Sequence, residues 1–166
     1  MGGKEKINHT VVKFNEVIKP IKMKIKDLPQ IIEIYKSYWG ERGLFKNSIF
    51  KNIIKQNLSY VYKINDEIIG FCLLEYLPNN NIIEIALLCI KEEYKSIHLG
   101  KTLLSFCINY CISNNYKNFS LHVSTKNIPA LRLYEQLGFT TRKLIKKYYN
   151  DEDPTVNDAY YMTLNV

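Results

Sequence analysis

Residues 82–104 of this chain, IIEIALLCIKEEYKSIHLGKTLL, decide its fold. The first nine residues are apolar except for Glu84, which is typical of a strand buried on both faces of a sheet. From Gly100 onward, apolar side chains recur at the three- and four-residue spacing of an amphipathic helix. The stretch therefore predicts a buried strand, a loop and a helix of a mixed α/β fold.

The patterns on either side predict the remaining strands and helices. Asp27 and Asn127 each precede a proline in the next turn, so both are expected to cap helices. The Asn65-Asp66 pair marks a hairpin turn. The expected elements are a strand at 17–25, a helix from Asp27 to Gly40, a helix at 47–56, strands at 59–64, 68–77 and 82–90, a helix at 100–113, a strand at 119–123, a helix from Asn127 to Gly138, and strands at 139–148 and 159–165.

This order, β-α-α-β-β-β-α-β-α-β-β, predicts a single α/β domain, and a length of 166 residues with 46% hydrophobic residues agrees with it. Residues 1–14 are polar and without periodicity, so we expect a flexible tail there and the domain at 15–166. No apolar run reaches membrane-spanning length, and the N-terminus lacks the apolar core of a secretory signal. We therefore expect a cytoplasmic protein that binds no membrane.

The charge of the chain favours small polyanionic ligands over nucleic acids. Lys and Arg total 23 against 16 Asp and Glu, for a formal net charge of +7, but only three of the cations are arginines. A lysine excess without an arginine cluster or a long basic run is weak evidence for nucleic-acid binding. It suits a phosphate-bearing cofactor instead.

The four cysteines, Cys72, Cys89, Cys107 and Cys111, form no C-x-x-C pair. No histidine lies at metal-ligand spacing from Cys107 and Cys111, which share a helix face. We therefore expect buried, reduced thiols and no metal, with a zinc site as the alternative. Reduced thiols also fit the cytoplasm.

Glu84 and His122 are polar residues at strand positions where packing alone would favour an apolar side chain. A carboxylate inside an apolar strand is costly unless it faces a cleft or a partner, and burial would raise its pKa towards that of a general base. An edge salt bridge or simple exposure is the alternative for Glu84. His122, in the strand Leu121-His122-Val123, is either a second base or an ordinary structural histidine.

The loop between the apolar strand and the next helix is a candidate phosphate site. A loop that ends at a helix N-terminus presents unpaired backbone N–H groups and the positive end of the helix dipole. Lys95 and Lys101 add positive charge. An ordinary strand-to-helix connection is the alternative, just as Asn127 can be only a cap and Tyr134 only an aromatic side chain on a helix face.

Together these segments resemble the GNAT superfamily of acetyl-CoA-dependent N-acetyltransferases. Residues 88–104 resemble its acetyl-CoA motif, and residues 130–139, ALRLYEQLGF, resemble its A-x-x-x-Y-x-x-x-G-F signature. The resemblance implies a mostly antiparallel seven-stranded sheet flanked by about four helices, with acetyl-CoA as cosubstrate. The cofactor-binding residues that it implies are Leu88, Cys89, Ile90, Lys95, Ser96, Ile97, His98, Leu99, Gly100, Lys101, Asn127 and Tyr134.

Within the superfamily, the chain is similar to catalytic subunits of protein N-α-acetyltransferases of the NatE and NatF types. The similarity lies in Leu121-His122-Val123 followed by Asn127, in residues 146–149 (KKYY), and in the acidic loop before Tyr160. It implies that His122 is a general base acting through water. It also implies a substrate-binding set of Tyr38, Ala86, Tyr148 and Tyr149, in which the paired tyrosines form part of a lid.

The chain departs from the family pattern at three places. His98 occupies the first glycine position of the R/Q-x-x-G-x-G/A loop, where backbone amides can bind pyrophosphate on the condition that His98 avoids positive φ. Glu84 stands where NatE and NatF types carry a tyrosine, although other GNAT members use a glutamate there as base. Residues 38–43 (YWGERG) replace the aromatic-proline substrate loop.

The resemblance predicts acetyl transfer by direct attack of an amine on acetyl-CoA, most plausibly the α-amino group of a protein N-terminus. Glu84 and His122 would accept the amine proton, the Ile90 N–H would hold the thioester oxygen, and Tyr134 would assist the departing thiolate. A small-amine (polyamine-like) or lysine acetyltransferase is the enzymatic alternative, and a degenerate acetyl-CoA-binding subunit is the non-enzymatic one. An auxiliary subunit or the ribosome is a further candidate partner.

Overall fold

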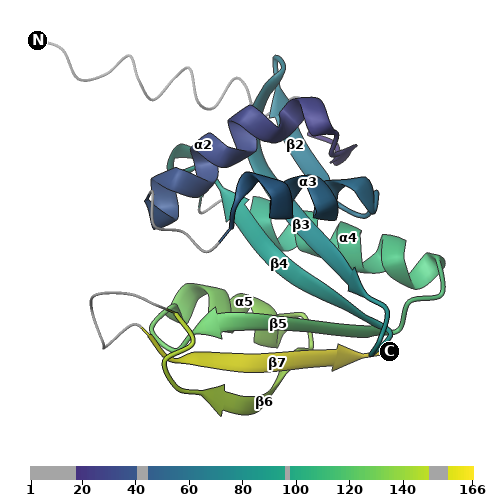
Figure 1. Ribbon diagram of the computed structural model, residues 1–166, viewed down its shortest axis with the longest axis vertical. Helices are drawn as coiled ribbons and strands as arrows, with labels where there is room; N and C mark the ends of the chain where they lie inside the picture. Colours follow the sequence, from purple (N-terminus) through teal and green to yellow (C-terminus); the bar gives the residue numbers. More distant parts are fainter. Residues whose placement is uncertain (1–17, 41–44, 96–97, 150–156) are drawn as a thin grey trace, which may run out of the picture.

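The computed structural model describes residues 18–40, 45–95, 98–149 and 157–166, and in these residues seven strands form one sheet in the order β1-β2-β3-β4-β5-β7-β6 (Figure 1). The strands are β1 (Ile21–Lys22), β2 (Tyr60–Ile64), β3 (Glu67–Leu77), β4 (Ile82–Ile90), β5 (Asn118–Ser124), β6 (Thr140–Ile145) and β7 (Ala159–Asn165). The α-helices are α2 (Leu28–Trp39), α3 (Asn47–Lys55), α4 (Leu99–Ser113) and α5 (Ile128–Gln136), and the short 3-10 helices are η1 (Ile25–Asp27) and η2 (Glu92–Tyr94). The predicted fold class and element order are confirmed.

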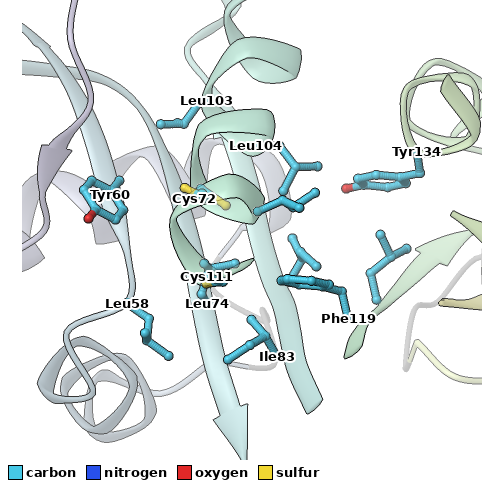
Figure 2. Close-up of a cluster of buried hydrophobic side chains, with 14 of the residues drawn as sticks. Leu58, Tyr60, Cys72, Leu74, Ile83, Leu103, Leu104, Cys111, Phe119 and Tyr134 are labelled. Atoms are coloured by element: carbon cyan, nitrogen blue, oxygen red, sulfur yellow. The ribbon is translucent and has the colours of Figure 1, made fainter. Parts of the chain in front are cut away.

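Helices cover both faces of the sheet. α2 and α3 pack on one face of β2, β3 and β4, and α4 packs on the other (Figure 1). The buried side of α4 is the stripe that the sequence periodicity predicts, and Figure 2 shows Leu103, Leu104 and Cys111 of this stripe beside Cys72 and Leu74 of β3. Two apolar layers therefore hold β4 rigidly in the middle of the sheet.

The pairing of β4 with β5 is the one parallel contact in the described sheet, and it is short. The register joins only Ile83 with Phe119 and Glu84 with Ser120, although β4 continues to Ile90 and β5 to Ser124. Beyond these pairs the strands diverge, so that the sheet opens into a V in Figure 1. The opened edge of β4 lies next to the candidate site.

A β-bulge at Ala86 reverses which side chains of β4 face each helix layer. Leu73 pairs with Leu87 but Leu74 pairs with Ile85, so Ala86 has no partner on β3. Before the bulge, the odd-numbered residue Ile85 packs in the cluster under α4; after it, the odd-numbered residue Leu87 packs in the cluster under α2 and α3. Glu84 consequently lies on the face of β4 opposite α4.

Several predicted boundaries and local contacts are wrong because long-range contacts decide them. The predicted strand 17–25 is reduced to Ile21–Lys22, since only these residues pair with β2 before the chain turns into η1. The Asp27 side chain does not cap α2; its carboxylate accepts hydrogen bonds from the Lys24 backbone N–H at 2.8 Å and from Lys63 Nζ at 2.7 Å. Leaving a buried carboxylate without partners costs more free energy than leaving a helix end without a side-chain cap, so the Asp27 carboxylate binds these two groups instead.

The predicted strand 139–148 also ends early, at Ile145. Lys147 adopts a left-handed φ of 54°, and its backbone N–H donates to the Asp158 carboxylate at 2.9 Å. The chain therefore turns at Lys147 instead of continuing along β7. The predicted N-terminal tail lies outside the described residues. Among the helices that are described, none is long and apolar enough to cross a membrane.

Candidate active site

Glu84 and His122 meet where β4 and β5 begin to diverge. Glu84 pairs with Ser120, so His122 lies two residues further along β5. His122 Nδ1 lies 2.8 Å from Glu84 Oε1, and each side chain keeps 20% of its surface exposed. The hydrogen bond fixes the imidazole ring, and Nε2 has no hydrogen-bond partner among the described residues. A carboxylate–imidazole pair of this kind can accept a proton from a nucleophile.

Two tyrosines pack against His122, and a third packs against one of them. The Tyr148 ring stacks on the imidazole at a centroid distance of 4.4 Å, and the Tyr161 ring lies at 5.1 Å. Tyr149 meets Tyr148 edge-on at 4.9 Å. Burial, followed by the nearby Glu84 charge, raises the pKa of Tyr148, and burial raises the pKa of Tyr149 further. Both phenols therefore stay protonated at neutral pH and can donate hydrogen bonds.

The sequence predicted Tyr148 and Tyr149 at the site but not Tyr161. The turn at Lys147 takes Tyr148 out of β6 and places it against His122. Tyr161 lies directly opposite His122 in the antiparallel pairing of β5 with β7. The two-residue alternation of β7 shows which of its side chains share a face, but only the register of β7 against β5 shows that Tyr161 lies opposite His122.

The end of β4 directs two peptide groups into the V. Lys91 N–H donates to the Ile69 carbonyl at 2.8 Å, so these two residues form a hydrogen-bonded pair. By alternation, Ile90 opposite Gly70, and Leu88 opposite Cys72, form non-hydrogen-bonded pairs, whose N–H and C=O groups point away from β3. The described part of β5 has no ladder contact with this edge.

Tyr38, at the C-terminal end of α2, forms a hydrogen bond to the end of β4. Its hydroxyl donates to the Ile90 carbonyl at 2.5 Å, and Lys95 Nζ lies 4.6 Å from the centre of its ring. Lys95 also pairs with Glu92 at 2.6 Å. Tyr38 therefore connects α2, the end of β4 and the loop before α4.

The N-terminus of α4 begins at a left-handed residue. His98 has φ 59° and ψ 13°, and its carbonyl accepts from both the backbone N–H and the hydroxyl of Thr102 at 3.0 Å. His98 therefore has a positive φ, and the condition that it must avoid one is wrong, because a glycine at this position of the loop would favour the same left-handed conformation. His98 adopts the conformation that glycine takes most easily, at a cost of roughly 1–2 kcal/mol. The loop thus keeps a glycine-like path, with Leu99 and Gly100 in the first turn of the helix.

The other predicted cofactor residues are spread around this helix. Lys101 Nζ lies 3.2 Å from the Gln136 side-chain oxygen, between α4 and α5. The Cys89 side chain is buried under α2 and α3, and by the same alternation its peptide groups face Phe71 of β3, so Cys89 offers no group to a ligand in the V. Ser96 and Ile97 lie outside the described residues. Among the residues that are described, no group of three His, Cys, Asp or Glu side chains could hold a metal ion.

Asn127 and Tyr134 belong to α5. The Asn127 side-chain oxygen accepts from the Ala130 N–H at 3.2 Å, which confirms the predicted cap. Tyr134 is 8% exposed, and its ring points from α5 toward Leu104 of α4 (Figure 2). Burial raises its pKa, with smaller effects from Cys72, Cys89 and Tyr149.

Residues 28–139 match the model of the Acetyltransferase (GNAT) family. The chain belongs to this family. It is an N-acetyltransferase that transfers an acetyl group from acetyl-CoA. An uncharacterized N-acetyltransferase of Methanocaldococcus jannaschii is 30% identical over 144 residues, which cover 81% of this chain and 86% of that protein.

Two further similarities are to a second relative and to a solved structure. An N-alpha-acetyltransferase of Sulfolobus acidocaldarius is 28% identical over 154 residues, covering 83% of this chain and 86% of the relative. The structure of Arabidopsis thaliana Naa50 in complex with the bisubstrate analogue CoA-Ac-MVNAL superposes with a TM-score of 0.76 at 22% identity. That superposition covers 90% of this chain and 99% of Naa50. At this identity, the structural likeness shows the shared fold.

The described residues fit acetyl-CoA. The open β4 edge offers the Leu88 and Ile90 peptide groups to an extended ligand arm, and the 15-residue helix α4 presents its N-terminal amides to an anion. Lys95 and Lys101 add positive charge at this end of the helix. The chain therefore offers hydrogen-bonding groups for an amide-containing arm and positive charge for phosphates, which are the two chemical parts of the coenzyme.

Proposed function

We propose that the chain is a protein N-α-acetyltransferase, which acetylates the free α-amino group of a polypeptide. The hydrogen-bonded pair of Glu84 and His122, where the V begins to open and beside Tyr148, carries this proposal. The pair can deprotonate an amine, and the tyrosines can contact the polypeptide that bears it. The relative named as an N-alpha-acetyltransferase supports the choice of acceptor.

The proposed reaction begins with removal of a proton from the acceptor. A free α-amine has a pKa near 8, so an ammonium arriving at neutral pH must lose a proton before it can attack. His122 Nε2, or Glu84 through an ordered water, accepts this proton. The neutral nitrogen then attacks the thioester carbonyl carbon and forms a tetrahedral intermediate.

The end of β4 and Tyr134 serve the second half of the reaction. The Ile90 N–H donates to the carbonyl oxygen as it gains negative charge. When the intermediate collapses, its nitrogen loses a second proton to water or to the member of the Glu84–His122 pair that is still unprotonated, the C–S bond breaks, the amide forms, and the coenzyme A thiolate leaves. Tyr134, whose pKa is raised by burial, donates a hydrogen bond or a proton to that sulfur. Asn127 contacts the pantetheine arm next to α5.

A small polyamine is the second candidate acceptor, and one observation favours it. Glu75 of β3 lies directly opposite Glu84, and both face away from α4. Burial, followed by the Glu84 charge, raises the pKa of Glu75. Two like charges in a cross-strand pair are unfavourable unless a cation lies between them. An acceptor with a second positive charge would supply that cation.

An acetyl-transfer assay separates these acceptors. The panel contains peptides with free N-termini, N-blocked peptides with an internal lysine, and putrescine with its monoamine counterpart butylamine. We expect transfer to the free N-termini. Transfer only to blocked peptides or to putrescine would contradict the N-terminal assignment.

The same assay tests the two proposed bases. Glu84→Gln and His122→Ala should each lower kcat by roughly 10²–10⁴-fold, because general-base catalysis has this size. Acetyl-CoA binding should be retained in both variants. Glu33→Gln removes the same charge from an exposed position of α2 and serves as the control. Unchanged turnover in both active-site variants would contradict the assignment.

We also propose a cytoplasmic location, with the ribosome or an auxiliary subunit as a further partner. All four cysteines are free and buried, which suits a reducing compartment. The net charge of +7, mostly lysine, suits weak contact with ribosomal RNA phosphates. Co-sedimentation with ribosomes that disappears as salt is raised would support the ribosome contact, and its absence at low salt would contradict it.

A further inference from the structure

We propose that Asp158, which immediately precedes β7, is a positioning residue for acetyl transfer. Its carboxylate holds the turn at Lys147, and this turn keeps the Tyr148 ring stacked on the His122 imidazole. The stack fixes the plane of the imidazole, and with it the direction of Nε2, before an acceptor amine arrives. This inference rests on the proposed role of His122 as a proton acceptor.

The hydrogen bond to Glu84 fixes the His122 imidazole only in part. It joins Nδ1 to Glu84 Oε1 at 2.8 Å, and both side chains remain partly exposed. The χ2 torsion of a histidine has a broad energy well, and a hydrogen bond tolerates deviations of roughly 30° from linearity. The ring could therefore still rock about its Cβ–Cγ bond, which would move Nε2 relative to a bound amine.

Tyr148 opposes this rocking motion. Its ring lies 4.4 Å from the imidazole, centre to centre, with only 9° between the two planes. A rotation of the imidazole out of its plane would push one edge of that ring into the Tyr148 face. The Tyr161 ring is tilted by 41° to the imidazole, so it supplies no second parallel face.

Tyr148 reaches His122 only because the backbone turns at the residue before it. Lys147 adopts φ 54°, a left-handed conformation that is unfavourable for a residue with a Cβ atom. In the preferred extended conformation, the chain would continue along β7 beyond the last residue of β6, Ile145. An unfavourable turn of this kind needs a contact that stabilises it.

The Asp158 side chain provides this contact. The Lys147 backbone N–H donates to the Asp158 carboxylate at 2.9 Å. The Tyr149 backbone N–H donates to the Asn157 carbonyl, also at 2.9 Å. The Tyr148 backbone is therefore held between two hydrogen bonds to the residues just before β7, and only the first of them depends on a side chain.

Asp158 is itself fixed by the sheet. Its carbonyl accepts from the Thr125 N–H at 3.0 Å, one residue beyond the pairing of Ser124 with Ala159. This bond involves backbone atoms alone, so a substitution of the Asp158 side chain leaves it in place. The carboxylate can thus be removed without freeing the start of β7.

The test compares two substitutions of Asp158. Asp158→Ala removes the acceptor of the Lys147 N–H. Asp158→Asn removes the negative charge but keeps an oxygen that can accept the same hydrogen bond, so it is the matched control. Circular dichroism and thermal unfolding establish that both variants fold, and all comparisons are made below the lower Tm.

The decisive readout is the proton NMR spectrum of the histidine rings. The chain has only three histidines, His9, His98 and His122, and His122→Ala identifies the His122 signals. Protons that lie over the face of an aromatic ring resonate upfield. We expect upfield His122 signals in the wild type and in Asp158→Asn. In Asp158→Ala they should move toward the positions that they have in Tyr148→Leu, whereas the His98 signals should stay unchanged.

Two measurements on the wild type need no substitution, and they keep the proposal open to refutation if Asp158→Ala does not fold. A nuclear Overhauser effect should connect the ring protons of Tyr148 and His122, and the Lys147 amide should exchange slowly with solvent. The absence of either signal would overturn the proposal. Unchanged His122 signals in a folded Asp158→Ala variant would also overturn it.

Kinetics distinguish a positioning role from a purely structural one. We expect Asp158→Ala to lower kcat about tenfold, as for a small misalignment at a reacting centre, while the KM for acetyl-CoA changes less than about twofold. Asp158→Asn should stay within about twofold of the wild-type kcat. A lowered Tm with unchanged kcat in Asp158→Ala would make Asp158 merely structural, and an equal loss of kcat in Asp158→Asn would exclude the hydrogen bond as the cause.

The NMR measurements need neither an acceptor nor acetyl-CoA. A wrong choice of acceptor would therefore appear only in the transfer panel, and a wrong role for His122 would appear as unchanged turnover in His122→Ala. A wrong role for Asp158 would appear in the His122 signals of its variants.

Discussion

Gly70→Ala should distort the end of β4, because Ile90 fills the space that a side chain would need. A Cβ atom built on Gly70 would lie 2.4 Å from Ile90 Cδ1, 3.0 Å from the Cys89 carbonyl oxygen and 3.4 Å from Ile90 Cα. Ordinary carbon contacts lie near 3.5–4.0 Å, so the Ile90 Cδ1 atom must move by about 1 Å, and the Cys89 carbonyl must move by a few tenths of an ångström. A change of rotamer can move Cδ1, but the Cys89 carbonyl can move only together with its strand.

The expected cost follows from these distances. Overpacking of this kind costs about 1–3 kcal/mol, and the lower entropy of the unfolded alanine chain offsets up to about 1 kcal/mol of it. We therefore expect a net loss of about 1–2 kcal/mol in unfolding free energy, with Tm lowered by about 2–4 °C per kcal/mol. Because the Ile90 N–H would move with its strand, kcat should fall by up to about 10²-fold. Urea unfolding and steady-state acetyl transfer measure the two effects.

Ile90→Val provides the matched rescue, because it removes the Cδ1 atom of the shortest contact. Alone it should cost about 0.5–1.5 kcal/mol, as is usual for a buried isoleucine. In combination with Gly70→Ala it should cost less than the sum of the two single changes, since the residues are in contact. Strict additivity in the double-mutant cycle, or a Gly70→Ala variant with wild-type stability and kcat, would refute the reasoning.

Three further substitutions test other parts of the structure. His98→Gly should leave the unfolding free energy unchanged or raise it by up to about 1 kcal/mol, because the relief of backbone strain is offset by the greater entropy of glycine in the unfolded chain. A clear decrease of the unfolding free energy, measured in urea, would contradict the presence of strain at His98. The folded-state pKa of Glu75 is raised, so the stability that this residue gives is present at low pH and is lost as pH rises above the usual glutamate value of about 4.3. Glu75→Gln should therefore be more stable than the wild type at pH 7, by a few tenths to about 1 kcal/mol, and the difference should vanish near pH 3 in unfolding measured across pH. A constant difference would mean that the charge of Glu75, disfavoured first by burial and then by repulsion from Glu84, is not its cause. Asn127→Ala should cost about 1 kcal/mol by removing the bond to the Ala130 N–H, whereas Asn127→Asp keeps an acceptor and should cost less; equal losses would count against the cap.

Features that depend on neighbours in the sequence could be predicted well. The apolar run of β4, the helical period of α4 and the cap at Asn127 all appear in the structure at or near the expected positions. Gly138, expected to end α5, has the left-handed φ of 89° that suits glycine there. Glu84 and His122 were recognised because an acid and a histidine are unusual within apolar strands, and the structure places them 2.8 Å apart.

Features that depend on register or on distant partners could not be predicted. Asp27 has the sequence context of a helix cap, but its carboxylate instead forms an ion pair at 2.7 Å with Lys63, which is remote in the sequence. Tyr161 joins the site only because β7 aligns it with His122. Tyr38 reaches Ile90 only because α2 packs over β4.

The sequence by itself therefore determined the order of elements, the apolar faces and the polar residues that packing cannot explain, because these depend on periodicity and local backbone preferences. The tertiary structure alone decided which edge of β4 is open, how the bulge at Ala86 divides its side chains between two cores, and which groups meet at that edge. The physical reason is that a shift of one residue in register moves every side chain to the opposite face of a strand. Contacts between distant segments, rather than local preferences, fix that register.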